Sequence, residues 1–116
     1  MAVINGRLAS QATTTSLVVA YTVPTGKRAN IRQIAITNVS GSAVTFRLAS
    51  LLSGEVAGDV TATDYLQYDT SLAANAALWL TFEGSDGLVL DAGASLAIRG
   101  SDTNTNINVF GQEVLL

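Results

Sequence analysis

The sequence predicts an all-β protein, an antiparallel β-sandwich of about eight strands with a jelly-roll-like arrangement. Apolar and polar residues alternate with a period of two in several short runs, which is typical of strands that keep one face on a core. Turn-forming residues recur about every 8–12 residues, the spacing found in sandwiches and barrels. A sustained 3.6-residue period is absent, so no long helix is expected.

The alternation defines the expected strands. In AVTFRLA (43–49), Val44, Phe46 and Leu48 share one face, and Thr45 and Arg47 share the other. Three further runs alternate in the same way, and their β-branched residues suit a pleated surface: SLVVAYTV (16–23), LWLTFE (78–83) and ASLAIRG (94–100). Nine ranges are assigned to about eight strands, since one range can be a bend: residues 2–9, 15–23, 30–39, 43–50, 65–72, 77–83, 87–91, 94–100 and 106–114.

The segments between these runs have turn chemistry. Proline and glycine in PTGK (24–27), and glycine with small polar residues in NVSGSA (38–43), predict hairpin connections. EGSDG (83–87) and DAG (91–93) are interpreted in the same way. Residues 51–64, LLSGEVAGDVTATD, do not alternate, and we expect a long loop there of the functional or disordered kind. At 116 residues without an internal repeat, a single domain over residues 1–116 is expected.

The composition indicates a protein that associates with other subunits. Charged residues make up 13% of the chain, against about 25% in ordinary proteins, while hydrophobic residues make up 48%. A domain of this size has a small core and much surface. We therefore expect a surface of small polar residues together with apolar patches buried against copies of the chain, in a homo-oligomer.

Several classes of protein are disfavoured by what the sequence lacks. The net charge is −3 without a basic block, so nucleic-acid binding is not expected. No apolar run approaches the roughly 20 residues that cross a bilayer, and the opening MAVINGRLAS lacks the pattern of a signal peptide. Without cysteine there is no disulfide or thiolate chemistry. We expect no cofactor and no metal.

Catalysis is not expected, because the chain has neither histidine nor cysteine and its single lysine, Lys27, lies in a turn. PTGKR lacks the spacing of a phosphate loop. Asp64 and Asp69 flank Tyr65 and Tyr68. This arrangement leaves open a carbohydrate-binding platform or a paired-carboxylate hydrolase. The alternative explanation is structural: a strand with acidic residues at its ends and packed aromatic rings. EGSDG and SDTNTNIN (101–108) offer oxygen ligands for calcium, but turns use the same residues.

The candidate interface residues are apolar side chains that the domain does not need for its own core. Trp79 lies opposite Leu78 and Leu80 on its strand, so it should point outward as an interface anchor, unless a second sheet or the long loop covers it. Both chain ends are apolar, although free ends are usually polar and frayed. They either dock into a neighbour or belong to a strand at the sheet centre; these end residues are Val3, Ile4, Val114, Leu115 and Leu116.

From residue 21 onward the chain contains four elements in a fixed order: a VPTGK turn (23–27) that opens a long strand, the NVSGSA loop (38–43), the GLVLDAGASLAI segment (87–98) and a closing VFGQEV strand (109–114). With these elements the chain resembles small β-sandwich proteins of tailed-bacteriophage virions. Similar motifs occur in head decoration or cement proteins and in tail or fibre modules. Ala94 departs from the pattern, since many relatives have an acidic residue there.

The resemblance implies a virion structural protein without an active site, assembled in the host bacterial cytoplasm. The expected function is that of a capsid decoration or cement protein, whose trimers bind the major capsid protein through Trp79, the chain ends and loop 51–64. A tail baseplate, adaptor or fibre module is the alternative within the virion. A carbohydrate-binding module for host attachment, using Tyr65, Tyr68 and Asp69, is the alternative outside that class.

Overall fold

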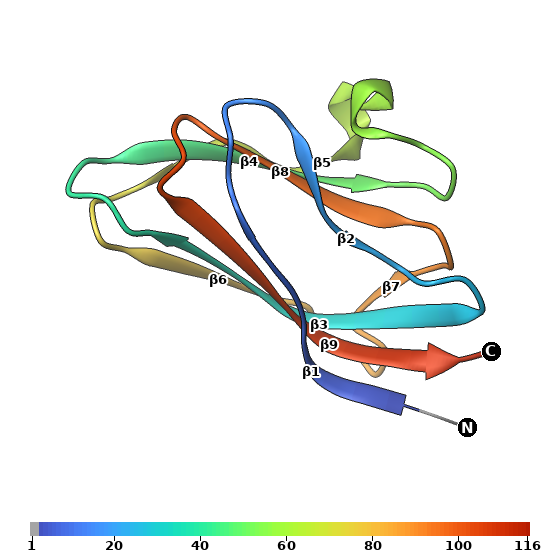
Figure 1. Cartoon of the computed structure of the whole chain (residues 1–116). Helices are drawn as coiled ribbons and strands as arrows, with labels where there is room; N and C mark the ends of the chain where they lie inside the picture. Colours follow the sequence, from blue (N-terminus) through green and yellow to red (C-terminus); the bar gives the residue numbers. More distant parts are fainter. Residues whose placement is uncertain (1–2) are drawn as a thin grey trace.

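The computed structural model describes residues 3–116, with side chains described from residue 6 onward. Within this range the chain forms an antiparallel sandwich of two sheets (Figure 1), which confirms the expected all-β sandwich. Sheet A has five strands in the order β1-β9-β3-β6, with β7 also paired to β3, and sheet B has four in the order β2-β8-β4-β5. The strands are β1 (Val3–Ala12), β2 (Val18–Thr22), β3 (Lys27–Asn38), β4 (Val44–Leu51), β5 (Tyr65–Leu72), β6 (Ala77–Thr81), β7 (Leu88–Leu90), β8 (Ser95–Gly100) and β9 (Thr105–Leu115).

The strands fall where the alternation predicts them, with ends that differ by a few residues. The connections differ from the prediction, because the turns join strands of opposite sheets. PTGK leads from β2 to β3, NVSGSA from β3 to β4, and DAG from β7 to β8. Within residues 3–116, β4 and β5 are the only consecutive strands that pair with each other, so the expected hairpins are wrong. Turn residues fix where the chain reverses, but they do not determine which sheet receives the next strand.

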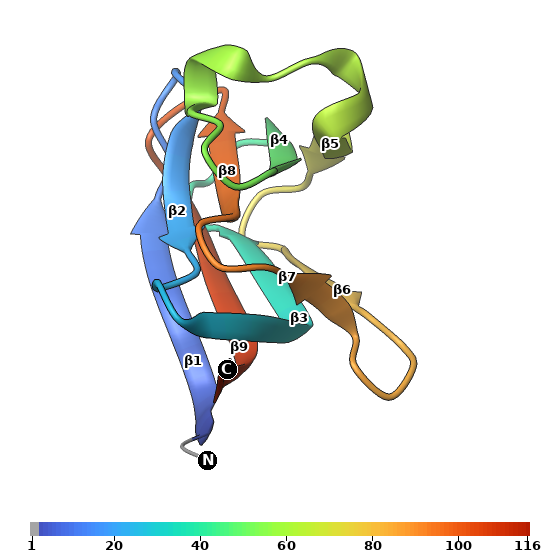
Figure 2. The same cartoon turned by 90° about the vertical axis from the view of Figure 1, so that its right-hand side faces the viewer.

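The EGSDG segment interrupts an edge strand of sheet A. β6 pairs with β3 at residues 33–37, and β7 pairs with β3 at residues 29–31, so the two lie end to end along one edge. Figure 2 shows the connecting loop extending away from the sheets. Arg32 anchors this loop by donating hydrogen bonds to the carbonyl oxygens of Gly84 and Ser85. Gly87 closes it at φ +64°, where a Cβ atom would lie 2.4 Å from the Ile31 carbonyl oxygen.

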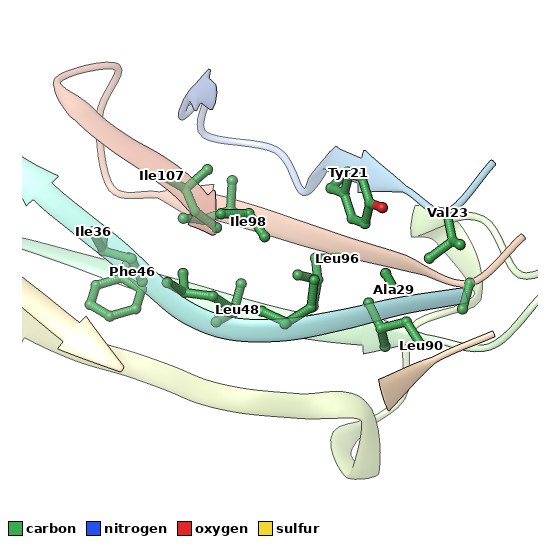
Figure 3. Close-up of a cluster of buried hydrophobic side chains, with 14 of the residues drawn as sticks. Tyr21, Val23, Ala29, Ile36, Phe46, Leu48, Leu90, Leu96, Ile98 and Ile107 are labelled. Atoms are coloured by element: carbon green, nitrogen blue, oxygen red, sulfur yellow. The ribbon is translucent and has the colours of Figure 1, made fainter. Parts of the chain in front are cut away.

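A β-bulge in β3 changes which residues face the core. Ile31 and Ile34 are both fully buried although they lie three positions apart. The register of β3 against β9 shifts between Ile31 and Gln33, as an extra residue requires. The core between the sheets is apolar on both sides (Figure 3), with Ile36 and Ile107 from sheet A packing near Phe46, Leu48 and Ile98 from sheet B.

One polar cluster is built into this core. The Tyr21 hydroxyl donates a 2.6 Å hydrogen bond to Oε2 of Glu113, and Nζ of Lys27 lies 3.4 Å from Oε1 of the same carboxylate. Burial, and then the hydrogen bond and charge of Glu113, raise the pKa of Tyr21 above its ordinary range. The cluster links β2 of sheet B to β3 and β9 of sheet A, and so ties the two sheets together at one end.

In the part of the chain that the structure describes, no helix is long and apolar enough to cross a membrane.

Candidate functional site

The outer face of sheet A presents a stacked aromatic pair. Trp79 on β6 and Phe110 on β9 stack with ring centroids 6.0 Å apart and an interplanar angle of 23°. The strand between them is β3, whose Ala35 pairs directly with Trp79 in the register. Ala35 is 4% exposed yet lies outside the core cluster, so it is covered from the outer side of the sheet. The small side chain leaves room for the two rings to meet above β3.

The strands on this face contribute positive charge, and none of their described outward side chains is a carboxylate. Arg7 on β1 pairs with Phe110 in the register, and Arg28 on β3 pairs with Val114. In the described strands of sheet A the only acidic residue is Glu113, whose side chain points inward to Tyr21. The aromatic pair therefore lies on a cationic surface in a protein whose net charge is −3.

Trp79 points outward, as the alternation predicts, and it is 56% exposed. Neither the second sheet nor the long loop covers it, because both lie on the opposite side of sheet A (Figures 1 and 2). Its role as an interface anchor stays a prediction. Phe110, its partner, was not among the expected interface residues. The sequence does contain a signal for Phe110. Ile107 and Val109 face the core, so the alternation places residues 108 and 110 on the outer face.

The chain ends meet at one end of sheet A. β9 lies between β1 and β3, so the last strand is central, which is one of the two explanations expected for an apolar end. Val114 is nevertheless only half-buried, and Leu115 and Leu116 are 43% and 76% exposed. Val3 pairs with Val114 through the backbone. The side chains of Val3 and Ile4 lie outside the described residues, so their predicted interface role is not addressed by the structure.

The long loop covers one end of the outer face of sheet B. Ala49 and Ala97 are fully buried, and Leu51 is 1% exposed, yet all three lie outside the core cluster between the sheets. The loop (green in Figures 1 and 2) passes on that side of the molecule, and its second turn contacts β4. The loop includes two short 3₁₀ turns, η1 (Ala57–Asp59) and η2 (Ala62–Asp64). It is an ordered cover with two exposed apolar side chains, Leu52 and Val56.

Three acidic side chains order this loop in the same manner. Each accepts a hydrogen bond from the backbone N–H three residues earlier: Glu55 from Leu52 at 2.8 Å, Asp59 from Val56 at 2.9 Å, and Asp64 from Thr61 at 2.9 Å. Asp64 therefore has its hydrogen-bond partner within its own turn. It does not share a partner with Asp69, the other carboxylate that flanks the tyrosines.

The uncovered part of sheet B contains a hollow of about 320 Å³, with these lining residues: Thr45, Phe46, Arg47, Asp69, Arg99, Gly100 and Ser101. At its edge Arg47 binds Asp69 through two hydrogen bonds, Nε to Oδ1 at 2.6 Å and a terminal nitrogen to Oδ2 at 3.1 Å. The guanidinium carbon of Arg47 lies 4.0 Å from the ring centroid of Tyr68. Tyr65 packs edge-on against Tyr68 at 4.9 Å. The structure thus brings together the predicted Tyr65, Tyr68 and Asp69.

A bulge in β5 places Asp69 at the hollow. Phe46 pairs with Thr70, but Leu48 pairs with Gln67, so two residues of β5 lie opposite Arg47. Asp69 takes φ +48°, in the left-handed region. The hydrogen bonds from Arg47, and then the charges of Arg47 and Arg99, lower the pKa of the Asp69 carboxyl, with desolvation opposing them. The alternation in each strand predicts that Arg47 and Arg99 point outward. Neither strand's sequence alone predicts that the register of β4 against β8 places the two arginines opposite each other.

The two segments with calcium-like composition have other partners. In SDTNTNIN the Asp102 carboxylate accepts a hydrogen bond from the Asn104 N–H at 2.9 Å, which is a local turn. In EGSDG the carbonyl oxygens of Gly84 and Ser85 bind the Arg32 guanidinium. Among the described residues no group of three or more acidic side chains is arranged to hold a metal ion.

Neither a scan against protein-family models nor a search of curated proteins gives a match to this chain.

Proposed function

We propose that this chain is a structural protein of a tailed-bacteriophage virion, which forms trimers and binds the outer surface of the head as a decoration or cement protein. The observation that supports it most is the stack of exposed Trp79 on half-buried Phe110, on a face of sheet A whose described strands present arginines and no outward carboxylate. Aromatic side chains with arginine nearby are enriched at the energetic centres of protein interfaces. The resemblance of residues 21–114 to phage virion proteins supports the same class.

The mechanism is adhesive. A protein that binds the assembled lattice but not its separate subunits stabilises that lattice by mass action. A β-sheet suits the task because its backbone pairing holds the side chains of the face in fixed positions, which limits the entropy lost on binding. The major capsid protein is the partner, and the complementary patch on it is apolar and acidic. No catalytic step, cofactor or metal is part of the proposal, and the virion is its location.

We also infer that the connectivity is jelly-roll-like. In support, the chain changes sheet at every connection of the described strands except β4–β5 and β6–β7. The first and last strands, β1 and β9, are then neighbours in one sheet. This arrangement closes the chain on itself and leaves the broad outer face of sheet A for contacts.

Substitution of Trp79 tests the proposal. Trp79→Ala should weaken binding to heads that lack the protein by about 2 kcal/mol, roughly 30-fold, because a central aromatic anchor is lost. The measurement is occupancy of purified heads at increasing protein concentration. Tyr68→Ala is the matched control, since Tyr68 is 57% exposed, as Trp79 is 56%, but belongs to sheet B. Unchanged occupancy with Trp79→Ala would contradict the assignment.

Copy number separates head from tail. A decoration protein covers the head lattice and should be present in hundreds of copies per particle, whereas a baseplate, adaptor or fibre module is present in few. Quantitative mass spectrometry of purified particles, normalised to the major capsid protein, gives this number. A few copies per particle would retain the virion class and move the protein to the tail.

A further inference from the structure

The lining of the hollow in sheet B contains two arginines and a single carboxylate. Arg47 on β4 and Arg99 on β8 are direct cross-strand partners. Like charges directly opposite each other destabilise a sheet. A single carboxylate, Asp69, lies beside them, and its two oxygens both bind Arg47. Asp69 is therefore the single counter-charge for two arginines, and the lining keeps an excess of one positive charge in a chain whose net charge is −3.

Arg99 is positioned to receive an anion. Its Nε donates a 2.9 Å hydrogen bond to the carbonyl oxygen of Thr15, which fixes the direction of the guanidinium group. Among the described residues Arg99 has no acidic side chain at ion-pair distance. Its two terminal nitrogens therefore keep donors for a ligand at the wall of the hollow. A guanidinium group binds a carboxylate with two parallel hydrogen bonds, an arrangement that an ammonium group cannot match.

The rest of the hollow suits a polyhydroxylated ring. Tyr68 does not line the hollow; its ring, 57% exposed, lies beside it, with one face 4.0 Å from the guanidinium carbon of Arg47. Asp69 adds carboxylate oxygens that can accept hydrogen bonds from hydroxyl groups, and its side chain is 51% exposed. Thr45 and Ser101 also line the wall. The volume of about 320 Å³ is at the lower end for small-molecule sites, so the hollow fits one or two sugar rings rather than a protein surface.

We propose that this hollow binds an acidic saccharide, a chain containing a carboxylate-bearing sugar such as a uronic acid. Arg99 binds the sugar carboxylate, and Asp69 accepts hydrogen bonds from ring hydroxyls. The costly features of the site have a purpose on this account: the opposed arginines, the bulge in β5 and the left-handed Asp69 all shape the same hollow. The proposal does not rest on the virion assignment, because the site lies on the sheet opposite Trp79.

An NMR titration with a galacturonic acid trisaccharide tests the proposal. The backbone amides of Tyr68, Asp69, Arg99 and Ser101 should shift with an affinity of roughly 1 mM or better. The methyl ester of the same trisaccharide, which lacks the negative charges, should bind at least tenfold more weakly. Arg99→Gln should cause a loss of the same size with the acidic trisaccharide. Trp79→Ala should leave the titration unchanged while it weakens head binding, so the two proposals can fail separately.

Three results would overturn the proposal. The first is the absence of shifts at these amides up to about 10 mM trisaccharide. The second is equal binding of the acid and its methyl ester, which depends on no variant and therefore holds even if Arg99→Gln fails to fold. The third is saturation by sodium acetate, at matched carboxylate concentration and ionic strength, with the same affinity and the same shifts, which would identify a simple anion site.

Discussion

The Asp69 side chain reaches Arg47 only because its backbone adopts φ +48° at a bulge. For a residue other than glycine, this conformation costs on the order of 1 kcal/mol. The bidentate ion pair offsets part of the cost, although an exposed pair contributes little to stability on its own.

The Asp69–Arg47 pair makes a prediction about pH. Because the pKa of Asp69 is lowered in the folded state, the pair stabilises the fold above the unfolded pKa of the carboxyl, and this contribution is lost as pH falls through the folded pKa. Arg47→Gln should raise the pKa of Asp69 toward its ordinary value. The measurement is the carboxyl ¹³C titration of Asp69 by NMR. Arg7→Gln, a matched change on sheet A, should leave it unchanged, and an Asp69 titration unaffected by Arg47→Gln would refute the explanation.

The buried hydrogen bond of Tyr21 makes a second prediction. Tyr21→Phe removes the donor that lies 2.6 Å from Oε2 of Glu113, and the carboxylate keeps only Lys27 at 3.4 Å. The free energy of unfolding should fall by about 1–3 kcal/mol, because a buried charged acceptor loses its partner. Urea denaturation measures the change. Tyr68→Phe removes an exposed hydroxyl and should cost no more than about 0.5 kcal/mol; equal effects of the two variants would contradict the assigned role of Glu113.

At the scale of the elements, Gly111 marks a place in sheet A where β9 leaves no room for a side chain against β3. Gly111 lies against β3, and a Cβ atom there would be 2.2 Å from the Asn30 carbonyl oxygen and 3.0 Å from the Ile31 Cα. The contact falls beside the bulge in β3, where the register against β9 shifts. Both neighbouring atoms belong to the backbone, so the sheet cannot adapt by rotating a side chain.

Gly111→Ala should accordingly loosen the pairing of β9 with β3. We expect the free energy of unfolding to fall by about 1–3 kcal/mol, the usual cost of overpacking. The change is measured by urea denaturation, and amide exchange should increase in β9. Gly41→Ala is the control, since a Cβ atom at Gly41 meets nothing within 4 Å, and it should change stability by less than about 0.5 kcal/mol. A tolerated alanine at position 111 would show that the two strands lie farther apart.

The strands were predictable from the sequence because their alternation is local. In the run 43–49 the burial of Val44, Phe46 and Leu48 follows directly from the pattern. The connections were not predictable, because residues such as PTGK favour a reversal in either a hairpin or a crossing between sheets. The same limit applies to the hollow. Tyr68 and Asp69 could be singled out by type, but the pairing of Arg47 with Arg99 depends on how β4 meets β8.

At the scale of the whole molecule, large apolar side chains remain exposed on several elements. The chain measures 45 × 27 × 21 Å along its principal axes, an elongated shape with a high ratio of surface to core. Single exposed apolar side chains are ordinary, but here they occur on both sheets, in the long loop and at the C-terminal end. The exposed large apolar residues of the described chain are Val19, Val39, Leu52, Val56, Leu66, Tyr68, Trp79, Val89, Leu115 and Leu116.

Association with copies of the chain is the simplest way to cover such a surface, and cyclic symmetry repeats each contact in every subunit. The purified protein should therefore be an oligomer, and its mass in solution is the direct test. Sedimentation equilibrium over a range of concentrations should give an oligomer, with three times the 12.0 kDa chain mass favoured. A mass that stays at 12.0 kDa up to roughly 1 mM protein would contradict it.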